Sequence, residues 1–345
     1  MKALVIHGPQ DLRYETVDDP KISDPRDLII AVKKCGICGS DLHLLHGTLP
    51  APRAAYGVGH EAVGEVVEAG SAVSELKVGD AVMLAASTGC GQCLPCLTGH
   101  IKRCEKSRLQ VYGVGGGLEG CQAEAVLVPA GDFNAARIPD GVTEEQAILL
   151  TDNLPTAYGA CLNANIRPGC TVGVVGLGPI GLMAVELAYV MGASRVYAID
   201  LVAERRQIAE QIGAIALVPD EAIEHVKADT KGKMIDCVVE AVGADATVEL
   251  ALGLVRVSGN ISILGVSMDI GFKIPSEVFL NGVTIAADYL TEVARHWPDL
   301  IPMIQSGRIK PERFITNRSG LADGVEAYKR FERREQGVLK AVLTP

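Results

Sequence analysis

The stretch VGVVGLGPIG (residues 172–181) decides the fold of the second half of the chain. Its apolar start predicts a β-strand, and the residues after it predict a helix. The turn between them has G-x-G-x-x-G spacing, and its candidate cofactor contacts are Gly176, Gly178, Pro179, Ile180 and Gly181. Glycines allow close approach of the backbone, and free amides at a helix start attract phosphate. The stretch therefore predicts a Rossmann-type domain that binds a dinucleotide.

The acid that ends the next predicted strand bears on which dinucleotide is bound. Asp200 closes the run VYAID (196–200). A carboxylate at this position accepts hydrogen bonds from a ribose 2′-hydroxyl and repels a 2′-phosphate. Arg205 and Arg206 follow closely and could instead attract a phosphate, or form a solvated helix face. The acid favours NAD over NADP.

The pattern around this turn divides the chain. Residues from about 155 to 285 alternate apolar strands with helical segments, which predicts a doubly wound parallel sheet. Residues 1 to about 150 contain short strands separated by Gly, Pro and Asp turns, which predicts a β-rich domain. After them come two amphipathic helical segments and a closing strand, LKAVLTP (339–345), which we expect to return to the first domain. A length of 345 residues also favours two domains.

Composition narrows the class of protein. The net charge is −10 and the pI is about 5.3, which argues against nucleic acid or an anionic membrane surface as partner. The start of the chain lacks the pattern of a signal peptide, and no apolar run is long enough to cross a membrane. These features predict a soluble, cytoplasmic enzyme that acts on small molecules.

A second stretch, CGQCLPCLTGHIKRC (residues 90–104), predicts a metal site. It holds Cys90, Cys93, Cys96 and Cys104. The cytosol keeps thiols reduced, so clustered cysteines favour zinc, with one or two disulfides as the alternative. Four thiolates leave no open coordination position. We therefore expect a structural zinc in a lobe of about residues 88–106.

Two further segments carry residues suited to chemistry. CGICGSDLH (35–43) contains Cys38, Ser40, Asp41 and His43, and GHE (59–61) adds His60 and Glu61. Taken singly, such residues are more often buried or on the surface without a role. Together with the four-cysteine stretch and the glycine turn, in this order, they resemble the zinc-dependent alcohol dehydrogenases of the medium-chain dehydrogenase/reductase family. The resemblance spans essentially the whole chain.

This resemblance implies a domain order and a catalytic metal. A GroES-like β-rich catalytic domain would occupy residues 1–152, a Rossmann NAD-binding domain residues 153–288, and a segment returning to the catalytic domain residues 289–345. Cys38, His60 and Asp152 would hold a catalytic zinc, with Asp152 in place of the cysteine found in many members. One thiolate, one imidazole and one carboxylate balance the ion and leave a fourth position open.

The resemblance also implies roles for the neighbouring residues. Ser40 would pass a proton through the cofactor ribose to His43. Asp41 and Glu61 would support the metal site, one of them orienting the His60 imidazole. Cofactor contacts would come from a set spread over the chain: Thr156, Arg205, Val242, Gly243, Leu264, Gly265, Val266 and Lys340.

The expected activity is reversible hydride transfer between a primary or secondary alcohol and NAD, with two zinc ions per chain. Alternatives are a polyol or sorbitol-type dehydrogenase, a formaldehyde dehydrogenase or dismutase, and a non-catalytic zinc- and nucleotide-binding regulatory protein. The family resemblance implies a homodimer or homotetramer, for which VTIAADYL (283–290) is a candidate interface strand. The other cysteines are expected to be small buried residues: Cys35, Cys121, Cys161, Cys170 and Cys237.

Overall fold

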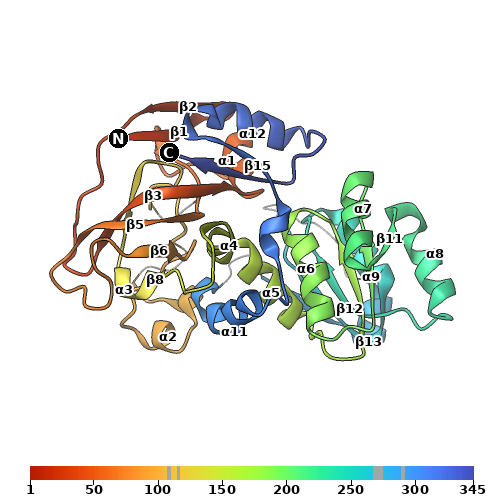
Figure 1. Cartoon of the computed structure of the whole chain (residues 1–345). Coiled ribbons are helices and arrows are strands. Elements are labelled where there is room, and N and C mark those ends of the chain that lie inside the picture. Colours follow the sequence, from red (N-terminus) through yellow and green to blue (C-terminus); the bar gives the residue numbers. More distant parts are fainter. Residues whose placement is uncertain (107–109, 115–116, 267–274, 289–291) are drawn as a thin grey trace. The chain divides into compact units, whose positions relative to one another are not determined.

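The computed structural model describes residues 1–106, 110–114, 117–266, 275–288 and 292–345 (Figure 1). The chain forms two compact units. The first comprises Met1–Pro155 and Glu292–Pro345, and the second Thr156–Thr291. The domain boundaries expected after residues 152 and 288 each lie three residues from the boundaries of these units.

The first unit is built on two sheets. One has seven strands in the order β15-β16-β3-β5-β6-β8, with β7 also paired to β3, and the other has the order β2-β1-β4. The strands are β1 (Lys2–Gly8), β2 (Asp11–Thr16), β3 (Leu28–Ile37), β4 (Tyr56–Gly57), β5 (Ala62–Ala69), β6 (Ala81–Leu84), β7 (Ala125–Val128), β8 (Ala135–Arg137), β15 (Ile315–Gly320) and β16 (Lys340–Thr344).

Short helices join these strands. The sequence pattern predicted only strands before residue 150 and therefore missed α1 to α4. Helix α4 begins with a capping box in which Thr143 and Gln146 each bond the backbone amide of the other. The helices of this unit are α1 (Asp41–His46), α2 (Leu94–Leu97), α3 (Gly131–Asn134), α4 (Glu144–Leu150), α11 (Val293–Gln305) and α12 (Gly324–Glu332), with 3-10 turns η1 (Ile101–Arg103), η2 (Pro311–Phe314) and η3 (Leu321–Asp323).

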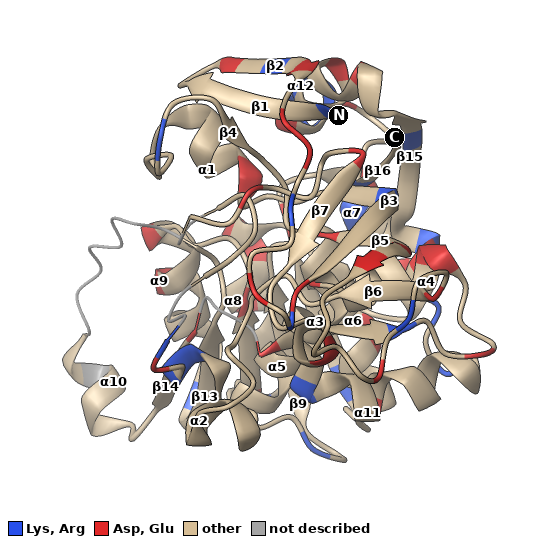
Figure 2. Ribbon diagram, turned by 90° about the vertical axis from the view of Figure 1, so that its left-hand side faces the viewer, with Lys and Arg blue, Asp and Glu red and all other residues tan. Residues whose placement is uncertain are grey.

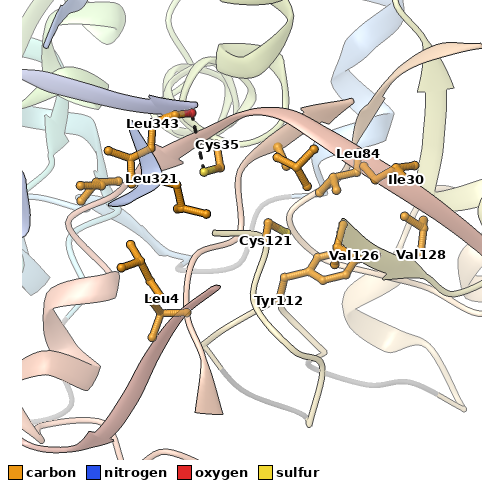
Figure 3. Packing of buried hydrophobic residues seen from close by; sticks show 14 of the residues in the cluster. Leu4, Ile30, Cys35, Leu84, Tyr112, Cys121, Val126, Val128, Leu321 and Leu343 are labelled. Carbon is orange, nitrogen blue, oxygen red and sulfur yellow. Dashed lines mark hydrogen bonds between the residues drawn. The ribbon is translucent and has the colours of Figure 1, made fainter. Parts of the chain in front are cut away.

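The C-terminal segment completes the first unit, as expected. Strand β16 pairs antiparallel with β3, so that Leu343 lies opposite Cys35. The Cys35 thiol donates to the Leu343 carbonyl at 3.8 Å, and Leu321 and Leu343 belong to the same buried cluster as Leu4 (Figure 3). The core of the β-rich unit is therefore shared by the two ends of the chain.

The second unit is a six-stranded parallel sheet in the order β11-β10-β9-β12-β13-β14. Counted along the chain this is 3-2-1-4-5-6, which confirms the doubly wound sheet. The strands are β9 (Thr171–Val175), β10 (Arg195–Ile199), β11 (Ile215–Leu217), β12 (Ile235–Glu240), β13 (Val255–Ile263) and β14 (Thr284–Ala287). The helices are α6 (Pro179–Val190), α7 (Ala203–Ile212), α8 (Pro219–Asp229), α9 (Asp245–Leu254) and α10 (Ser276–Leu280).

Helix α5 (Asn153–Asn163) carries the chain from the first unit into the second. The strand order reverses between β9 and β12, and ligands of such sheets bind beyond the carboxyl ends of the strands at this point. The glycine turn follows β9 directly. The fold therefore positions the turn where a dinucleotide is expected.

The distribution of charged residues, the length of the helices and the burial of the cysteines can be compared with the sequence expectations. Lys, Arg, Asp and Glu residues lie on elements throughout the described chain (Figure 2). Within the described ranges, no helix has the length and apolar character needed to cross a membrane. All ten cysteines are free thiols and buried, which confirms the expected burial of the five outside the two proposed metal sets.

Candidate active site

Three distant segments of the first unit bring together the residues expected to bind a catalytic metal. Cys38 follows β3, His60 precedes β5, and Asp152 precedes α5. The Asp152 Oδ2 atom lies 3.6 Å from the Cys38 Sγ atom and 3.5 Å from the His60 Nε2 atom. Cys38 and His60 are buried, with 8% and 3% of their surface exposed. The three side chains thus converge on one point.

These separations fit a zinc ion. Zinc bonds of about 2.0–2.3 Å in a tetrahedron separate the ligand atoms by about 3.3–3.8 Å. One thiolate, one carboxylate and one neutral imidazole also balance the charge of the ion. The Glu61 carboxylate is the fourth possible donor, and the donor atoms of all four residues lie within 4.8 Å of one another. The donor set therefore fits a zinc ion.

Asp41 lies on the side of the His60 ring that faces away from the other proposed ligands. Its Oδ1 atom lies 3.2 Å from the His60 Nδ1 atom, and its Oδ2 atom accepts a hydrogen bond from the Cys38 amide at 2.9 Å. Burial alone would lower the pKa of His60, but the charge of Asp41 and the hydrogen bonds to Asp152, Asp41 and Cys38 outweigh it and raise that pKa well above its ordinary value.

Two buried residues extend this support, and sequence reasoning missed both. The Gln122 Nε2 atom donates to Asp41 Oδ2 at 3.3 Å and to the Gly36 carbonyl at 2.9 Å. The Tyr328 hydroxyl, from α12, donates to the Gln122 Oε1 atom at 2.9 Å. Tyr328 lies 206 residues after Gln122, so no local pattern could have linked them. The C-terminal segment therefore contacts Asp41, next to His60, through Tyr328 and Gln122.

Lys340 has a different neighbour from the one expected. We expected it to contact the cofactor, whereas its Nζ atom lies 2.5 and 2.6 Å from the two Glu61 carboxylate oxygens and 3.0 Å from the Ile37 carbonyl. β16 pairs with β3, and this pairing buries Lys340 beside Glu61. A Cβ atom on Gly36 would lie 2.0 Å from Glu61 Oε2, so only glycine fits beside the pair.

We assign this pair as ionised. Burial raises the pKa of Glu61, but the Lys340 ammonium opposes that change. Burial would lower the pKa of Lys340, and the charge of Glu61 outweighs it and raises that pKa. The short contacts of one ammonium with both carboxylate oxygens favour the charged form.

The two residues expected to relay a proton lie at the start of α1. The Ser40 hydroxyl is 3.3 Å from the His60 Nε2 atom, so it lies beside the ligand atoms. The His43 side chain is half-buried, and its Nδ1 atom lies 3.0 Å from the Thr48 hydroxyl. Thr48 was not singled out from the sequence. Ser40, the first residue of the expected relay, therefore lies beside the proposed metal ligands. His43, the last residue, lies next to the exposed Thr48.

The four-cysteine stretch folds into a separate cluster. Cys90 Sγ and Cys96 Sγ lie 3.9 Å apart, and the Cys90 amide donates to Cys104 Sγ at 3.4 Å. A disulfide would require about 2.05 Å, whereas sulfurs around one zinc lie about 3.8 Å apart. Hydrogen bonds from the Glu105 and Cys96 amides lower the pKa of Cys93. The cluster fits a structural zinc.

The glycine turn joins β9 to α6, which is the strand-to-helix junction that the sequence predicted. Gly176 has φ = 92°, in the region that favours glycine, and Pro179 is the first residue of α6. A Cβ atom on Gly181 would lie 1.9 Å from the Gly176 carbonyl oxygen, so the helix packs against the turn only with glycine there. A Cβ atom on Gly178 would meet nothing within 4 Å. Gly178 thus leaves space for a ligand.

Asp200 links the end of β10 to this turn. Its Oδ2 atom accepts a hydrogen bond from the Leu177 amide at 2.7 Å, and its Oδ1 atom accepts one from the Val202 amide at 2.7 Å. Arg206 bonds the carbonyl oxygen of Asp200 at 2.7 Å rather than its carboxylate. Arg205 is half-buried on α7. Both carboxylate oxygens of Asp200 therefore accept hydrogen bonds from backbone amides, one of them in the turn.

The other expected cofactor residues of this unit follow β12 and β13. A Cβ atom on Gly265 would lie 1.9 Å from the Gly243 nitrogen, so the two segments 242–243 and 264–266 touch through their backbones. Glu240, which sequence reasoning missed, accepts hydrogen bonds from the Val242 and Gly243 amides, both at 2.9 Å. Thr156 is buried on α5. The residues expected after β9, β10, β12 and β13 therefore lie at one edge of the sheet.

Comparisons with known proteins agree with both units. Residues 24–140 match the alcohol dehydrogenase GroES-like domain, and residues 179–306 match the zinc-binding dehydrogenase family. The chain is 40% identical over 346 residues to a probable zinc-binding alcohol dehydrogenase of Mycobacterium tuberculosis, covering 100% of this chain and 89% of the relative.

Two solved structures share the whole fold. An alcohol dehydrogenase from Thermus sp. ATN1 is 35% identical with a TM-score of 0.93, covering 100% of this chain and 99% of that chain. The 2R,3R-butanediol dehydrogenase of Bacillus subtilis is 27% identical with a TM-score of 0.86, and the coverage is again 100% and 99%. The chain belongs to the zinc-dependent alcohol dehydrogenases of the medium-chain dehydrogenase/reductase family.

Proposed function

We propose that this protein is an NAD-dependent dehydrogenase that transfers hydride reversibly between a small primary or secondary alcohol and NAD. The observation that carries the proposal is the convergence of Cys38, His60 and Asp152, three donors of the kind that hold a catalytic zinc with one position open. A zinc ion held there would act as a Lewis acid toward the substrate oxygen. The four-cysteine cluster would hold a second, structural zinc.

The residues of the first unit divide the remaining tasks. Asp41, whose Oδ1 atom lies 3.2 Å from the His60 Nδ1 atom, would orient the imidazole and leave the Nε2 atom for the metal. Ser40, whose hydroxyl lies 3.3 Å from that Nε2 atom, would take the substrate proton. His43 would pass the proton on toward solvent, since imidazole rings exchange protons near neutral pH.

The second unit would bind the cofactor. Amides of the turn from Gly176 to Gly181 and the start of α6 suit the pyrophosphate. The Asp200 carboxylate favours an unphosphorylated ribose and hence NAD. The segments 242–243 and 264–266 offer backbone groups for the ribose and nicotinamide, as the family resemblance implies, with Thr156 as a further contact.

A vicinal diol is the second candidate substrate. One structure that matches the whole chain is a 2R,3R-butanediol dehydrogenase, so the scaffold accommodates diols in a relative. Because fold does not choose substrate, an assay panel should contain simple alcohols, diols, polyols and formaldehyde.

The test is zinc content together with turnover in the parent and in Asp152→Ala. We expect two zinc ions per chain falling to about one, and NAD-dependent turnover falling at least about 10³-fold, because the catalytic ion is lost. One zinc in an active parent would contradict the proposed site. Full turnover with NADP but not NAD would contradict the cofactor assignment.

We also propose a homo-oligomer that uses the β14 edge of the parallel sheet. Among the described residues β14 is the last strand of the sheet, and Phe279 and Leu280 on α10 are 84% and 79% exposed. Of the candidate interface strand 283–290, residues 289 and 290 lie outside the described residues. Phe279→Glu should reduce the mass measured by light scattering, and Val78→Glu, an exposed apolar residue of the first unit, should not.

A further inference from the structure

Asn153 is a buried polar residue at the metal site that neither the sequence patterns nor the proposed mechanism uses. It is the first residue of α5 and is 1% exposed. Its Nδ2 atom lies 2.9 Å from Asp152 Oδ2, 3.0 Å from Glu61 Oε1 and 3.8 Å from Cys38 Sγ. One amide nitrogen therefore contacts two of the three proposed ligands and the nearby fourth donor.

The neighbours of this nitrogen identify it as the donor end of the side chain. An amide oxygen turned the same way would face two carboxylate oxygens at about hydrogen-bond distance, which is repulsive. The Asn153 Oδ1 atom is buried and has no hydrogen-bond partner among the described residues. Such an oxygen costs about 1–3 kcal/mol, so packing alone does not explain an asparagine at this position.

The contacted oxygen of Asp152 is the one that points into the site. Asp152 Oδ2 is also the atom 3.6 Å from Cys38 Sγ and 3.5 Å from His60 Nε2. A hydrogen bond to that oxygen fixes its position while leaving it a lone pair for a metal. Asn153 is neutral, so unlike the Lys340 ammonium it adds no charge that would repel a cation.

We propose that Asn153 is a positioning residue of the catalytic metal site, which holds Asp152 in place and weakens electron donation by the Cys38 thiolate. Hydrogen bonds to anionic ligands withdraw electron density from them, so the bound ion keeps more of its positive charge. This inference rests on the proposed metal site.

The test uses cobalt(II) in place of zinc, because thiolate-to-cobalt charge transfer reports the electron density on sulfur. The variants are Asn153→Leu, which has similar size and no donor, and Asn153→Ser, which keeps one donor. Asn163→Leu, at the exposed end of the same helix, is the matched control. Subtracting the spectrum of Asp152→Ala removes the contribution of the four-cysteine cluster.

In Asn153→Leu we expect the charge-transfer band of this site to move to longer wavelength. We also expect cobalt affinity, measured by chelator competition, to fall about 10- to 100-fold. Asn153→Ser should lie between Asn153→Leu and the parent, and Asn163→Leu should match the parent. A purely structural role would lower the melting temperature of the metal-free protein without moving the band.

The outcomes separate the two proposals. If Asp152→Ala and the parent have the same cobalt spectrum, the proposed metal site itself fails. If those two spectra differ but Asn153→Leu keeps the band position and affinity of the parent, only the role of Asn153 is overturned.

Discussion

The two proposed metal sites of the first unit are built on different principles. The four-cysteine cluster takes its donors from residues 90–104, and backbone amides of the same loop hydrogen-bond to the sulfurs. The second site takes Cys38 and Asp152 from positions 114 residues apart and is supported by side chains from still other segments. The first should therefore depend on its own loop, and the second on the folding of the whole unit.

Removing a donor from the cluster should have the largest effect on stability. Cys96→Ala should release one zinc ion per chain, lower the free energy of unfolding by several kcal/mol and open residues 88–106 to protease. Zinc content and the urea midpoint measure this. Cys121→Ala, another buried cysteine, is the control and should keep both metals. Unchanged zinc content in Cys96→Ala would contradict the cluster as a zinc site.

Breaking the buried ion pair tests how far the second site depends on the C-terminal strand. Lys340→Met leaves the Glu61 carboxylate buried without its cation, which should cost about 3–5 kcal/mol in urea denaturation. The double variant Glu61→Gln with Lys340→Met removes both charges and should recover most of that loss. If the double variant is no more stable than Lys340→Met, the unpaired charge of Glu61 is not the cause of the lost stability.

The hydrogen-bond network of Asp41, Gln122 and Tyr328 should affect only the second site. Tyr328→Phe removes the hydroxyl that bonds Gln122 and should cost about 1–2 kcal/mol. It should weaken metal binding a few-fold at the second site and not at the cluster, as chelator competition would show. Tyr112→Phe is the control, because the buried Tyr112 hydroxyl has no hydrogen-bond partner among the described residues. If Tyr328→Phe weakened metal binding equally at both sites, the four-cysteine cluster would not be independent of the rest of the unit.

The smallest effect should come from the link between the cluster and the rest of the unit. The Asp132 carboxylate accepts hydrogen bonds from the Ser74, Glu75 and Leu76 amides, and it precedes Phe133, which packs on the cluster. Partial burial would raise the pKa of Asp132, but these amides outweigh it and hold that pKa below its ordinary value.

The sign of the pH effect follows. Because the pKa is lower in the folded protein, the stabilisation is present above the unfolded value of about 4 and disappears as pH falls through the folded value. Asp132→Asn should therefore lower the stability by about 1 kcal/mol at pH 7 and by less at pH 3. Loss of zinc from the cluster in this variant would show that the loop is not self-sufficient.

Local features could be predicted from the sequence because their physics is local. The turn at Gly176 depends on backbone conformation within one strand-to-helix junction, and the spacing of Cys90 to Cys104 lies within one loop. The alternation of strands and helices likewise predicted the parallel sheet. Helix α4 escaped prediction, because its seven residues are too short for a clear period in a region dominated by strands.

The catalytic site could be predicted only in part. The resemblance supplied Cys38, His60 and Asp152, but it left open which of Asp41 and Glu61 orients the imidazole. The geometry favours Asp41 for this role, since its Oδ1 atom lies 3.2 Å from the His60 Nδ1 atom whereas Glu61 pairs with Lys340.

By itself, then, the sequence determined the glycine turn, the four-cysteine loop and the order of strands and helices, because each depends on residues close together in the chain. Only the tertiary structure decided where Lys340 points, how Tyr328 reaches Gln122, and that Asn153 contacts three donor residues. Those contacts join positions 279, 206 and up to 115 residues apart. Burial is the physical reason, because a polar group removed from water needs a partner, and the packing of distant strands determines which partner it meets.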